Sequence, residues 1–222
     1  MQSNIAIIPA RLGSKRIKQK NIKVFYSKPI IQWTYEILKK SKIFSKIILC
    51  TESEKIIKEC QKFGFNEYLK RNKKLSRDNV GTNLVIEYAI NKVEKNISFQ
   101  NVCCVYPCNP FLKINNLKKA LKIVNLNSNS FVQTVTKFDH PPEKSFLMKK
   151  NNQLNFLNKK LFFKNTQYFK NRYYDAGQFY FANKNVWLNK KKIKRIGIEI
   201  PKWHTVDIDT KEDWRFAKLL FK

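Results

Sequence analysis

Glycine and acidic residues are both scarce in this chain of 222 residues. It holds only 5 glycines. It has 16 Asp and Glu residues but 45 Lys and Arg residues, which gives a formal net charge of +29. Neither the GxxxxGK[ST] loop nor the GxGxxG loop, both of which cradle phosphates, is present. Any phosphate-binding loop here must therefore use cationic side chains together with backbone amides.

Long apolar runs are also missing. No run reaches the roughly 20 residues that a membrane-spanning helix needs, and the N-terminus lacks the basic and apolar segments of a signal peptide. The 5 cysteines show no CxxC spacing and no Cys/His cluster that would indicate zinc. We therefore expect a cytoplasmic protein without a membrane segment, whose cysteines are free thiols.

Apolar residues make up 43% of the chain and aromatic residues 14%, enough for the core of one domain. Short aliphatic strands alternate with amphipathic helices, which predicts an α/β fold with a mainly parallel sheet. The segment at about 138–173 interrupts this rhythm with prolines, amides and scattered aromatic residues, and is interpreted as an insert. The expected strands are Ile5–Ile8, Lys46–Cys50, Val102–Tyr106, Phe131–Val135, 176–183 and 195–201. The expected helices are Pro29–Ser41, one opened by a Thr51/Glu54 capping box that runs through about Phe63 and is stopped by Gly64, Asn83–Lys95, Ile114–Val124, and one after Thr210, which Asp213 caps reciprocally.

The positive charge has two interpretations. It favours a nucleic-acid partner, but lysine is abundant on every expected helix surface, and runs such as the one containing Lys191 are typical of solvated surfaces. None of the usual nucleic-acid-binding motifs accompanies the charge. We therefore expect no nucleic-acid binding, with a non-catalytic RNA-binding protein kept as the distant alternative. The two histidines, His140 and His204, lie far apart in the sequence and are predicted to be structural.

The first expected strand runs directly into a basic loop. In an open α/β sheet, ligands bind at the carboxyl ends of the strands, so this loop is well placed for a ligand. It offers one glycine for close backbone approach, a hydroxyl and several cations, which suits a triphosphate. Charge alone does not distinguish such a site from a solvated loop. The groups in question are Gly13, Ser14 and the cations Arg11, Lys15, Arg16, Lys18, Lys20 and Lys23.

A second group of chemical interest is Asp207-Ile208-Asp209 near the end of the chain. Residues two apart in an extended segment face the same side, so both carboxylates should face one site while Ile208 packs inward. Two carboxylates together with substrate phosphates are the usual way in which proteins hold Mg²⁺. In the alternative interpretation, Asp209 only helps to cap the following helix and Asp207 pairs with a lysine.

The segments IIPARLGSKRIKQKN and VDIDTKEDW together resemble the family of cytidylyltransferases that activate nine-carbon acidic sugars as CMP-sugars. The stretch YYDAGQFYF is similar to the branch that acts on pseudaminic acid, and Tyr106 stands where sialate enzymes usually carry glutamine. The resemblance covers nearly the whole chain. It implies one Rossmann-like nucleotidyltransferase domain over 1–222, whose sheet is flanked by helices and whose insert is a dimerisation arm.

The resemblance also implies a reaction and a set of site residues. CTP and pseudaminic acid would give CMP-pseudaminic acid and diphosphate in a cytoplasmic homodimer that uses Mg²⁺. CMP-N-acetylneuraminic acid and CMP-legionaminic acid synthesis remain alternatives, as does the eight-carbon acceptor Kdo. The implied roles are phosphate binding and catalysis for Arg11 and Lys20, metal binding and catalysis for Asp207 and Asp209, nucleotide binding for Ala10, Gly13, Ser14, Lys15, Asn21, Arg71 and Thr82, and sugar binding for Tyr106, Asp175 and Gln178.

Overall fold

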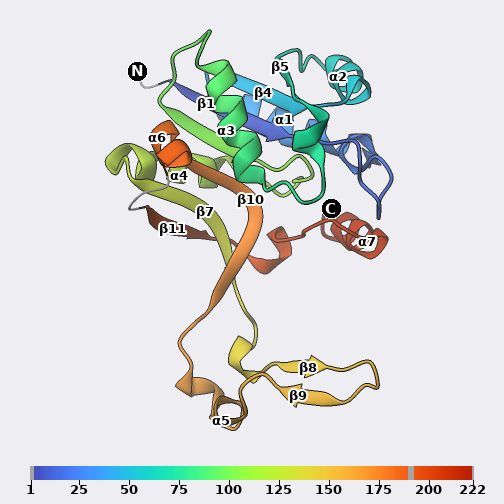
Figure 1. Ribbon diagram of the computed structural model, residues 1–222, viewed down its shortest axis with the longest axis vertical. Helices are drawn as coiled ribbons and strands as arrows, with labels where there is room; N and C mark the ends of the chain where they lie inside the picture. Colours follow the sequence, from blue (N-terminus) through green and yellow to red (C-terminus); the bar gives the residue numbers. More distant parts are fainter. Residues whose placement is uncertain (1–2, 190–192, 222) are drawn as a thin grey trace.

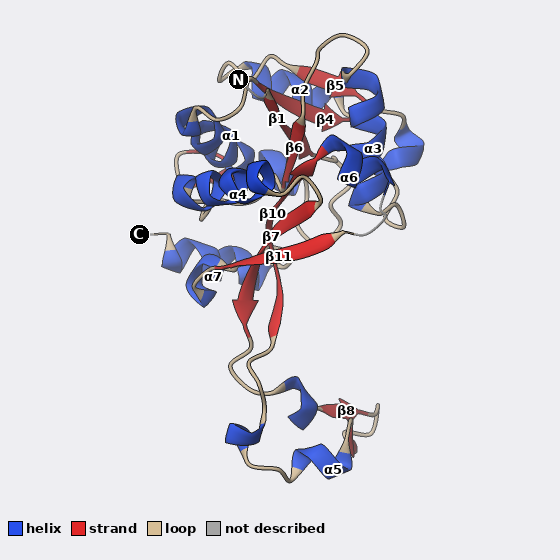
Figure 2. Ribbon diagram, turned by 90° about the vertical axis from the view of Figure 1, so that its left-hand side faces the viewer, coloured by secondary structure: helices blue, strands red, loops and turns tan. Residues whose placement is uncertain are grey.

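A central sheet of seven strands, seen from two directions in Figures 1 and 2, organises the protein. The computed structural model describes residues 3–189 and 193–221, so Lys191 lies outside the described residues. The strand order is β11-β7-β10-β6-β1-β4-β5. The bounds are β1 Asn4–Pro9, β4 Lys46–Thr51, β5 Tyr68–Lys70, β6 Asn101–Val105, β7 Ser130–Lys137, β10 Tyr173–Asn183 and β11 Lys194–Glu199.

The prediction of a mainly parallel sheet is confirmed, and β10 is the exception. It runs antiparallel to both of its neighbours, β6 and β7, whereas the other pairings in this sheet are parallel. The cause lies in the insert, because the chain leaves the sheet at the end of β7 and returns beside it, so that Tyr173 pairs with Lys137. A return at the same end of the sheet can only give an antiparallel strand.

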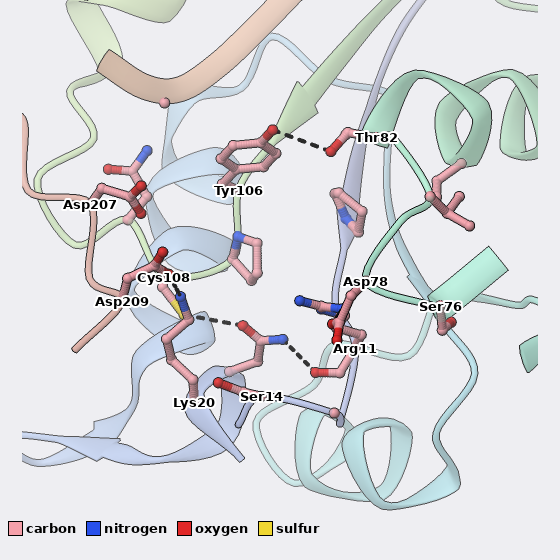
Figure 3. Close-up of a pocket in the computed structure, with 18 of the residues that line it drawn as sticks. Arg11, Ser14, Lys20, Ser76, Asp78, Thr82, Tyr106, Cys108, Asp207 and Asp209 are labelled. Carbon is pink, nitrogen blue, oxygen red and sulfur yellow. Dashed lines mark hydrogen bonds and ion pairs between the residues drawn. The ribbon is translucent and has the colours of Figure 1, made fainter. Parts of the chain in front are cut away.

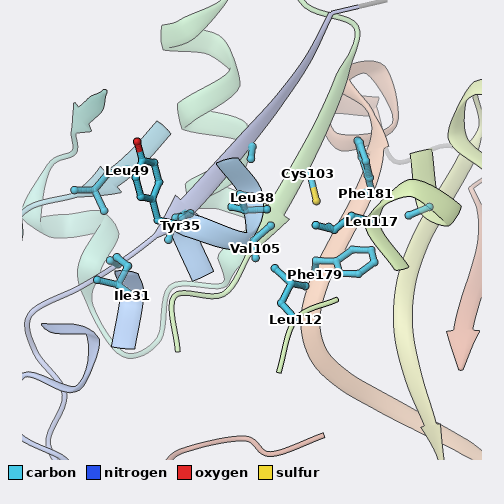
Figure 4. Packing of buried hydrophobic residues seen from close by; sticks show 14 of the residues in the cluster. Ile31, Tyr35, Leu38, Leu49, Cys103, Val105, Leu112, Leu117, Phe179 and Phe181 are labelled. Carbon is cyan, nitrogen blue, oxygen red and sulfur yellow. The ribbon is translucent and has the colours of Figure 1, made fainter. Parts of the chain in front are cut away.

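Helices cover both faces of the sheet (Figure 2). Ala6 and Ile8 of β1 belong to a buried cluster with α1, α2 and α4, whereas Ile5 and Ile7 belong to one with α3 and α6. Figure 4 shows part of the first cluster, in which Leu117 of α4 lies beside Phe179 and Phe181 of β10. Alternate residues of β1 therefore belong to two buried clusters, one on each face of the sheet, as expected of a central strand. The helix bounds are α1 Ile30–Ser41, α2 Glu54–Gln61, α3 Thr82–Val93, α4 Ile114–Leu126, α5 Lys159–Phe162, α6 Lys184–Asn189 and α7 Lys211–Leu220, with 3₁₀ turns η1 Lys20–Ile22, η2 Lys73–Ser76, η3 Pro142–Lys144, η4 Thr166–Tyr168 and η5 Lys202–His204.

The predicted helix ends are confirmed in part. The Thr210/Asp213 capping box of α7 is present, and Gly64 lies just beyond α2 with a φ of 81°. The predicted capping box of α2 is wrong, because Ser53 and not Thr51 caps this helix and accepts a hydrogen bond from the Ile56 N–H. Thr51 instead ends β4, since the parallel pairing with β5 extends to that residue.

A third buried cluster fixes the end of the chain. Ile208 and Trp214 pack with Phe25 and Ile30, at the short hairpin of β2 (Val24–Phe25) and β3 (Lys28–Pro29). Ile208 is only 1% exposed. The prediction that this isoleucine packs inward is therefore confirmed, and its burial fixes the segment that carries Asp207 and Asp209.

Residues between β7 and β10 project far from the sheet (Figure 1). They form the small hairpin of β8 (Phe146–Met148) and β9 (Leu154–Phe156), followed by α5. The aromatic rings of Phe146, Phe156 and Phe162 pack together here, with ring centroids no more than 5.3 Å apart. We call residues 138–172 the arm. It is too small to have a large core, and its outer apolar side chains remain exposed.

Candidate active site

A cavity of about 730 Å³ lies at the carboxyl ends of the central strands. The loops after β1, β5 and β6 contribute to its wall, together with the bend of β10 and the segment before α7. The residues to which the resemblance assigns a role all line this cavity except Ala10 and Asp175, and of the loop cations Lys18 and Lys23 do not line it. The structure therefore brings together residues that are up to 198 positions apart in the chain, from Arg11 to Asp209.

Figure 3 shows how the labelled side chains are distributed around this cavity. Asp207 and Asp209 lie on one side, and Arg11 lies on the opposite side beside Asp78. Tyr106 and Thr82 close a third side, where the two hydroxyl oxygens are 3.2 Å apart. We call these sides the basic wall, which carries Arg11 and the loop after β1, the acidic wall, which carries Asp207 and Asp209, and the aromatic wall, which carries Tyr106.

The basic loop after β1 is held by Asn21, which is 6% exposed. Its Nδ2 donates to the Arg11 carbonyl oxygen at 2.8 Å, and the Cys108 thiol donates to its Oδ1 at 3.1 Å. Burial raises the pKa of Cys108 to about 12, so this thiol stays protonated and can donate. An added Cβ on Gly13 would meet no heavy atom within 4 Å, so the loop has open space beside its backbone.

Two acids from outside the loop neutralise its cations. Asp78 pairs with Arg11 and, at 2.8 Å, with Lys15. Asp209 pairs with Arg16, and its Oδ1 accepts from the Lys20 ammonium at 2.8 Å. The Lys20 ammonium also donates to the Ile208 carbonyl oxygen at 2.6 Å. These contacts place Lys20 between the loop and the acidic wall.

The two carboxylates of the acidic wall differ in their surroundings. Burial alone would raise the pKa of Asp209, but the hydrogen bond and charge of Lys20, together with Arg16, hold it below its ordinary value. Burial and the adjacent charge of Asp209 raise the pKa of Asp207. Within the described residues, the Asp207 carboxylate has no hydrogen-bond or ion-pair partner.

This acidic pair fits a divalent cation that is shared with a phosphate ligand. A free carboxylate beside a second one carries repulsion that a cation would relieve. In residues 3–189 and 193–221, no group of three or more Asp, Glu, His or Cys side chains could hold a metal by itself. Mg²⁺ is commonly bound by one or two carboxylates plus phosphate oxygens and water, so the pair matches that ion.

The aromatic wall is organised by Asp175, although this residue does not itself line the cavity. Its Oδ1 accepts from the Gly177 N–H at 2.9 Å, and its Oδ2 accepts from the Tyr180 hydroxyl at 2.6 Å. Tyr180 packs edge-on against Tyr106, with ring centroids 5.6 Å apart. In a regular strand Asp175 and Tyr180 would lie on opposite faces, but the register of β10 shifts between them and Gly177 adopts a φ of 61°, so Asp175 reaches the Tyr180 hydroxyl.

Gln178 is part of the lining of the cavity and is 2% exposed. Its Nε2 donates to the His204 carbonyl oxygen at 2.8 Å, and its Oε1 is buried without a partner among the described residues. His204 was expected to be structural, and its carbonyl does hold Gln178, but the residue also lines the cavity. Burial and then the charge of Lys113 lower the pKa of His204, which favours a neutral ring.

Sequence reasoning missed Glu52, Ser76 and Asp78. The last two line the cavity, and all three contact predicted site residues. Asp78 and Ser76 lie in a polar stretch where nothing in the local pattern distinguishes them. Glu52 did have a signal, because it follows a strand expected to end at the same sheet edge as β1.

Comparison with known proteins places the chain among nucleotide-transferring enzymes. A family model described as "Cytidylyltransferase" matches residues 5–214. A pseudaminic acid cytidylyltransferase of Campylobacter jejuni is 35% identical over 223 residues, which cover 99% of this chain and 96% of that protein. An N-acylneuraminate cytidylyltransferase of Escherichia coli is 29% identical over 63% of this chain and 32% of its own length.

The fold has a solved counterpart. The structure of CMP:2-keto-3-deoxy-manno-octonic acid synthetase complexed with CTP matches with a TM-score of 0.74, covering 98% of both chains at 13% identity. At this identity the likeness shows the fold alone.

No helix among the described residues is long and apolar enough to cross a membrane.

Proposed function

Because the chain belongs to the cytidylyltransferase family, we propose that it transfers the cytidylyl group of CTP to pseudaminic acid and releases diphosphate. The observation that carries this proposal is the 35% identity, along nearly the full length of both chains, to a protein of that activity. The cavity supports it, because a basic wall and a pair of carboxylates face one space of suitable size for a nucleotide and a sugar.

The reaction needs no covalent enzyme intermediate. The anomeric hydroxyl of the sugar attacks the α-phosphorus of CTP, a new O–P bond forms, the hydroxyl proton is lost, and the bond from the α-phosphorus to the bridging oxygen of diphosphate breaks. Catalysis then consists of positioning and of neutralising charge on the phosphates. Arg11, Ser14, Lys15 and Lys20 are the proposed phosphate ligands, since all four line the cavity on the loop after β1.

Asp207 and Asp209 are the proposed Mg²⁺ ligands. Bound there, the ion would neutralise phosphate charge and lower the pKa of a hydroxyl that it binds. The contact between Lys20 and Asp209 holds the loop against the acidic wall, so that phosphates and carboxylates face each other. Asn21, Arg71 and Thr82 are the proposed contacts to ribose and cytosine, and all three line the same cavity.

The sugar is proposed to bind at the aromatic wall, against Tyr106 and Gln178. The unpaired Oε1 of Gln178 is an acceptor that suits an amide N–H of an acylamino group. Asp175 would then act on the sugar through Gly177 and Tyr180, to which it is hydrogen bonded.

The arm is proposed to hold two copies of the chain together. Its exposed apolar side chains support this, because contiguous exposed apolar surface usually marks an interaction site. Leu147 is 60% exposed and Met148 is 71% exposed. We further propose a single nucleotidyltransferase domain over 1–222 and a cytoplasmic location, which suits a protein whose 5 cysteines are all free thiols.

Diphosphate release tests the activity. The protein is incubated with CTP, MgCl₂ and each of pseudaminic, N-acetylneuraminic, legionaminic and 3-deoxy-manno-octulosonic acid. We expect release that requires both the metal and a sugar, and that is fastest with pseudaminic acid. Absence of release with every sugar would refute the proposed activity, and release without a sugar would indicate a different reaction.

A further inference from the structure

Glu52 is a partly buried acid just after β4, with a side chain that is 12% exposed. We infer that Glu52 is a positioning residue, which holds Arg71 and the loop after β1 in the geometry that receives the nucleotide. This inference rests on the proposed function for the identity of the ligand, CTP. Glu52 does not itself line the cavity, but it contacts two segments that contribute to the lining, the loop after β1 and the segment of Arg71.

Both carboxylate oxygens of Glu52 are used, and their partners come from separate segments. Oε1 accepts from the backbone N–H of Leu12 at 2.9 Å, inside the loop after β1. Oε2 accepts from the Ser76 hydroxyl at 2.7 Å and from Arg71 Nη2 at 3.3 Å. One carboxylate therefore joins the loop after β1 to the segment that follows β5.

Arg71 is only 5% exposed, and its guanidinium is held on three sides. Nε donates to the Ser76 hydroxyl at 2.9 Å, while Nη2 faces Glu52 and, at 3.5 Å, the carbonyl oxygen of Ala10. Nη1 has no partner among the described residues, although Arg71 lines the cavity. Glu52 and Ser76 therefore fix the direction of a guanidinium that belongs to the lining of the cavity.

The charge of Glu52 matters as well as its shape. Burial alone would raise the pKa of Glu52, but the hydrogen bonds from Leu12 and Ser76 and the charge of Arg71 hold it below its ordinary value. The residue is therefore ionised at neutral pH and is the counter-ion of Arg71. Removing one partner of such a buried pair leaves the other charge uncompensated, which is costly.

The test compares two variants that each remove one negative charge. Glu52→Gln keeps the size of the side chain, but its amide nitrogen cannot accept from Ser76 or Arg71. The matched control is Glu54→Gln, because Glu54 is exposed, pairs with Lys70 and does not line the cavity. The measurements are the Kd of CTP by calorimetry, the KM of CTP and of the sugar, kcat and the Tm.

For Glu52→Gln we expect the Kd and KM of CTP to rise roughly tenfold or more, as for a lost hydrogen bond between charged groups. The KM of the sugar should stay within about twofold, Glu54→Gln should match the parent, and Glu52→Asp should recover part of the CTP affinity by restoring the charge. A merely structural role would lower the Tm while leaving both KM values unchanged, and this result would overturn the inference.

Two further outcomes are separable. If Glu52→Gln does not fold, Ser76→Ala replaces it, because it removes one partner from both Glu52 and Arg71; an unchanged Kd for CTP would then refute the positioning role. If the parent binds CTP but turns over no sugar, the proposed function fails, whereas a weakened Kd in Glu52→Gln would still support the inference.

Discussion

At the scale of single residues, the cavity supplies counter-ions for its own cations. Asp78 pairs with Arg11 and Lys15, and Asp209 pairs with Arg16 and Lys20. Arg11, Lys15 and Asp78 are exposed, and ion pairs of exposed side chains contribute little stability, so a triphosphate can displace Asp78 from the loop. Charge-assisted hydrogen bonds to phosphate would then replace the ion pairs.

Asp209 provides the first test at this scale. We predict that activity requires a divalent cation and that Asp209→Asn lowers kcat by about 10²–10³, the usual cost of removing one contact to transition-state charge. The matched control is Asp139→Asn, because Asp139 pairs with Lys202 outside the cavity. Steady-state kinetics with a magnesium titration measures this. An Asp209→Asn protein with the turnover of the parent would refute the metal assignment.

Lys20 provides the second test, because it is the loop cation that contacts the acidic wall. We predict that Lys20→Ala loses most CTP turnover, whereas Lys46→Ala, which removes a cation paired with Glu67 on the surface, does not. Diphosphate release at fixed CTP concentration compares the two variants. Equal losses would show that the overall positive charge of the protein, and not this loop, attracts the nucleotide.

At the scale of elements, the bend in β10 shapes the sugar side of the cavity. Gly177 has a φ of 61°, and its N–H is held by Asp175. Tyr106 pairs its backbone N–H with the Gln178 carbonyl oxygen at 3.1 Å, so the bend also fixes the start of the loop after β6. The positions of Tyr106 and Gln178 at the cavity therefore depend on the backbone conformation of Gly177.

Gly177→Ala tests this dependence. The left-handed backbone costs about 1–2 kcal/mol for a residue with a Cβ, so we predict a Tm lower by several degrees and a higher KM for the sugar, with the KM of CTP unchanged. Gly64→Ala is the control, because its φ of 81° gives similar strain far from the cavity. An equal rise in the KM of the sugar in both variants would contradict the account.

The sequence predicted the elements whose patterns are local, and less of what depends on long-range contact. The strand at Ile5–Ile8, its basic loop and the same-face pair Asp207 and Asp209 follow from short periodicities, and Ile208 is buried as expected. The antiparallel direction of β10 could not be predicted, because it depends on where the arm returns to the sheet. The register shift of β10 had a weak signal in Gly177, since an isolated glycine within a strand often marks a bulge. Glu52 acquires its role only when β4, β1 and the Arg71 segment meet.

At the scale of the whole molecule, the net charge of +29 exceeds what the cavity requires. Most of the described lysines do not line the cavity, for example Lys118, Lys119 and Lys122 on α4. The proposed triphosphate ligand would account for the charge of the basic loop, whereas the remaining charge reflects the lysine-rich composition of the chain. The interpretation as an RNA-binding protein gains no support from the fold.

The arm gives the prediction at this scale. If it joins two copies, Leu147→Lys combined with Met148→Lys should shift the mass measured by light scattering from that of a dimer to about 26.5 kDa, because buried lysines would be unpaired. Leu126→Lys is the control, since Leu126 is 78% exposed at the end of α4 and lies outside the arm. A parent protein that is already monomeric, or a double variant that remains dimeric, would refute the proposed role.

The central claim is that the protein transfers CMP from CTP to pseudaminic acid in this cavity. The most direct test is to measure kcat/KM with CTP for pseudaminic acid and for N-acetylneuraminic acid, and to take the ratio of the two values. A buried acceptor such as the Gln178 Oε1 discriminates strongly against a sugar that lacks the matching N–H, by up to ~10⁴–10⁵ in favourable cases. We predict that the parent prefers pseudaminic acid and that Gln178→Ala reduces the ratio. A parent that prefers N-acetylneuraminic acid would contradict the assignment, and an unchanged ratio in Gln178→Ala would contradict the account of its specificity.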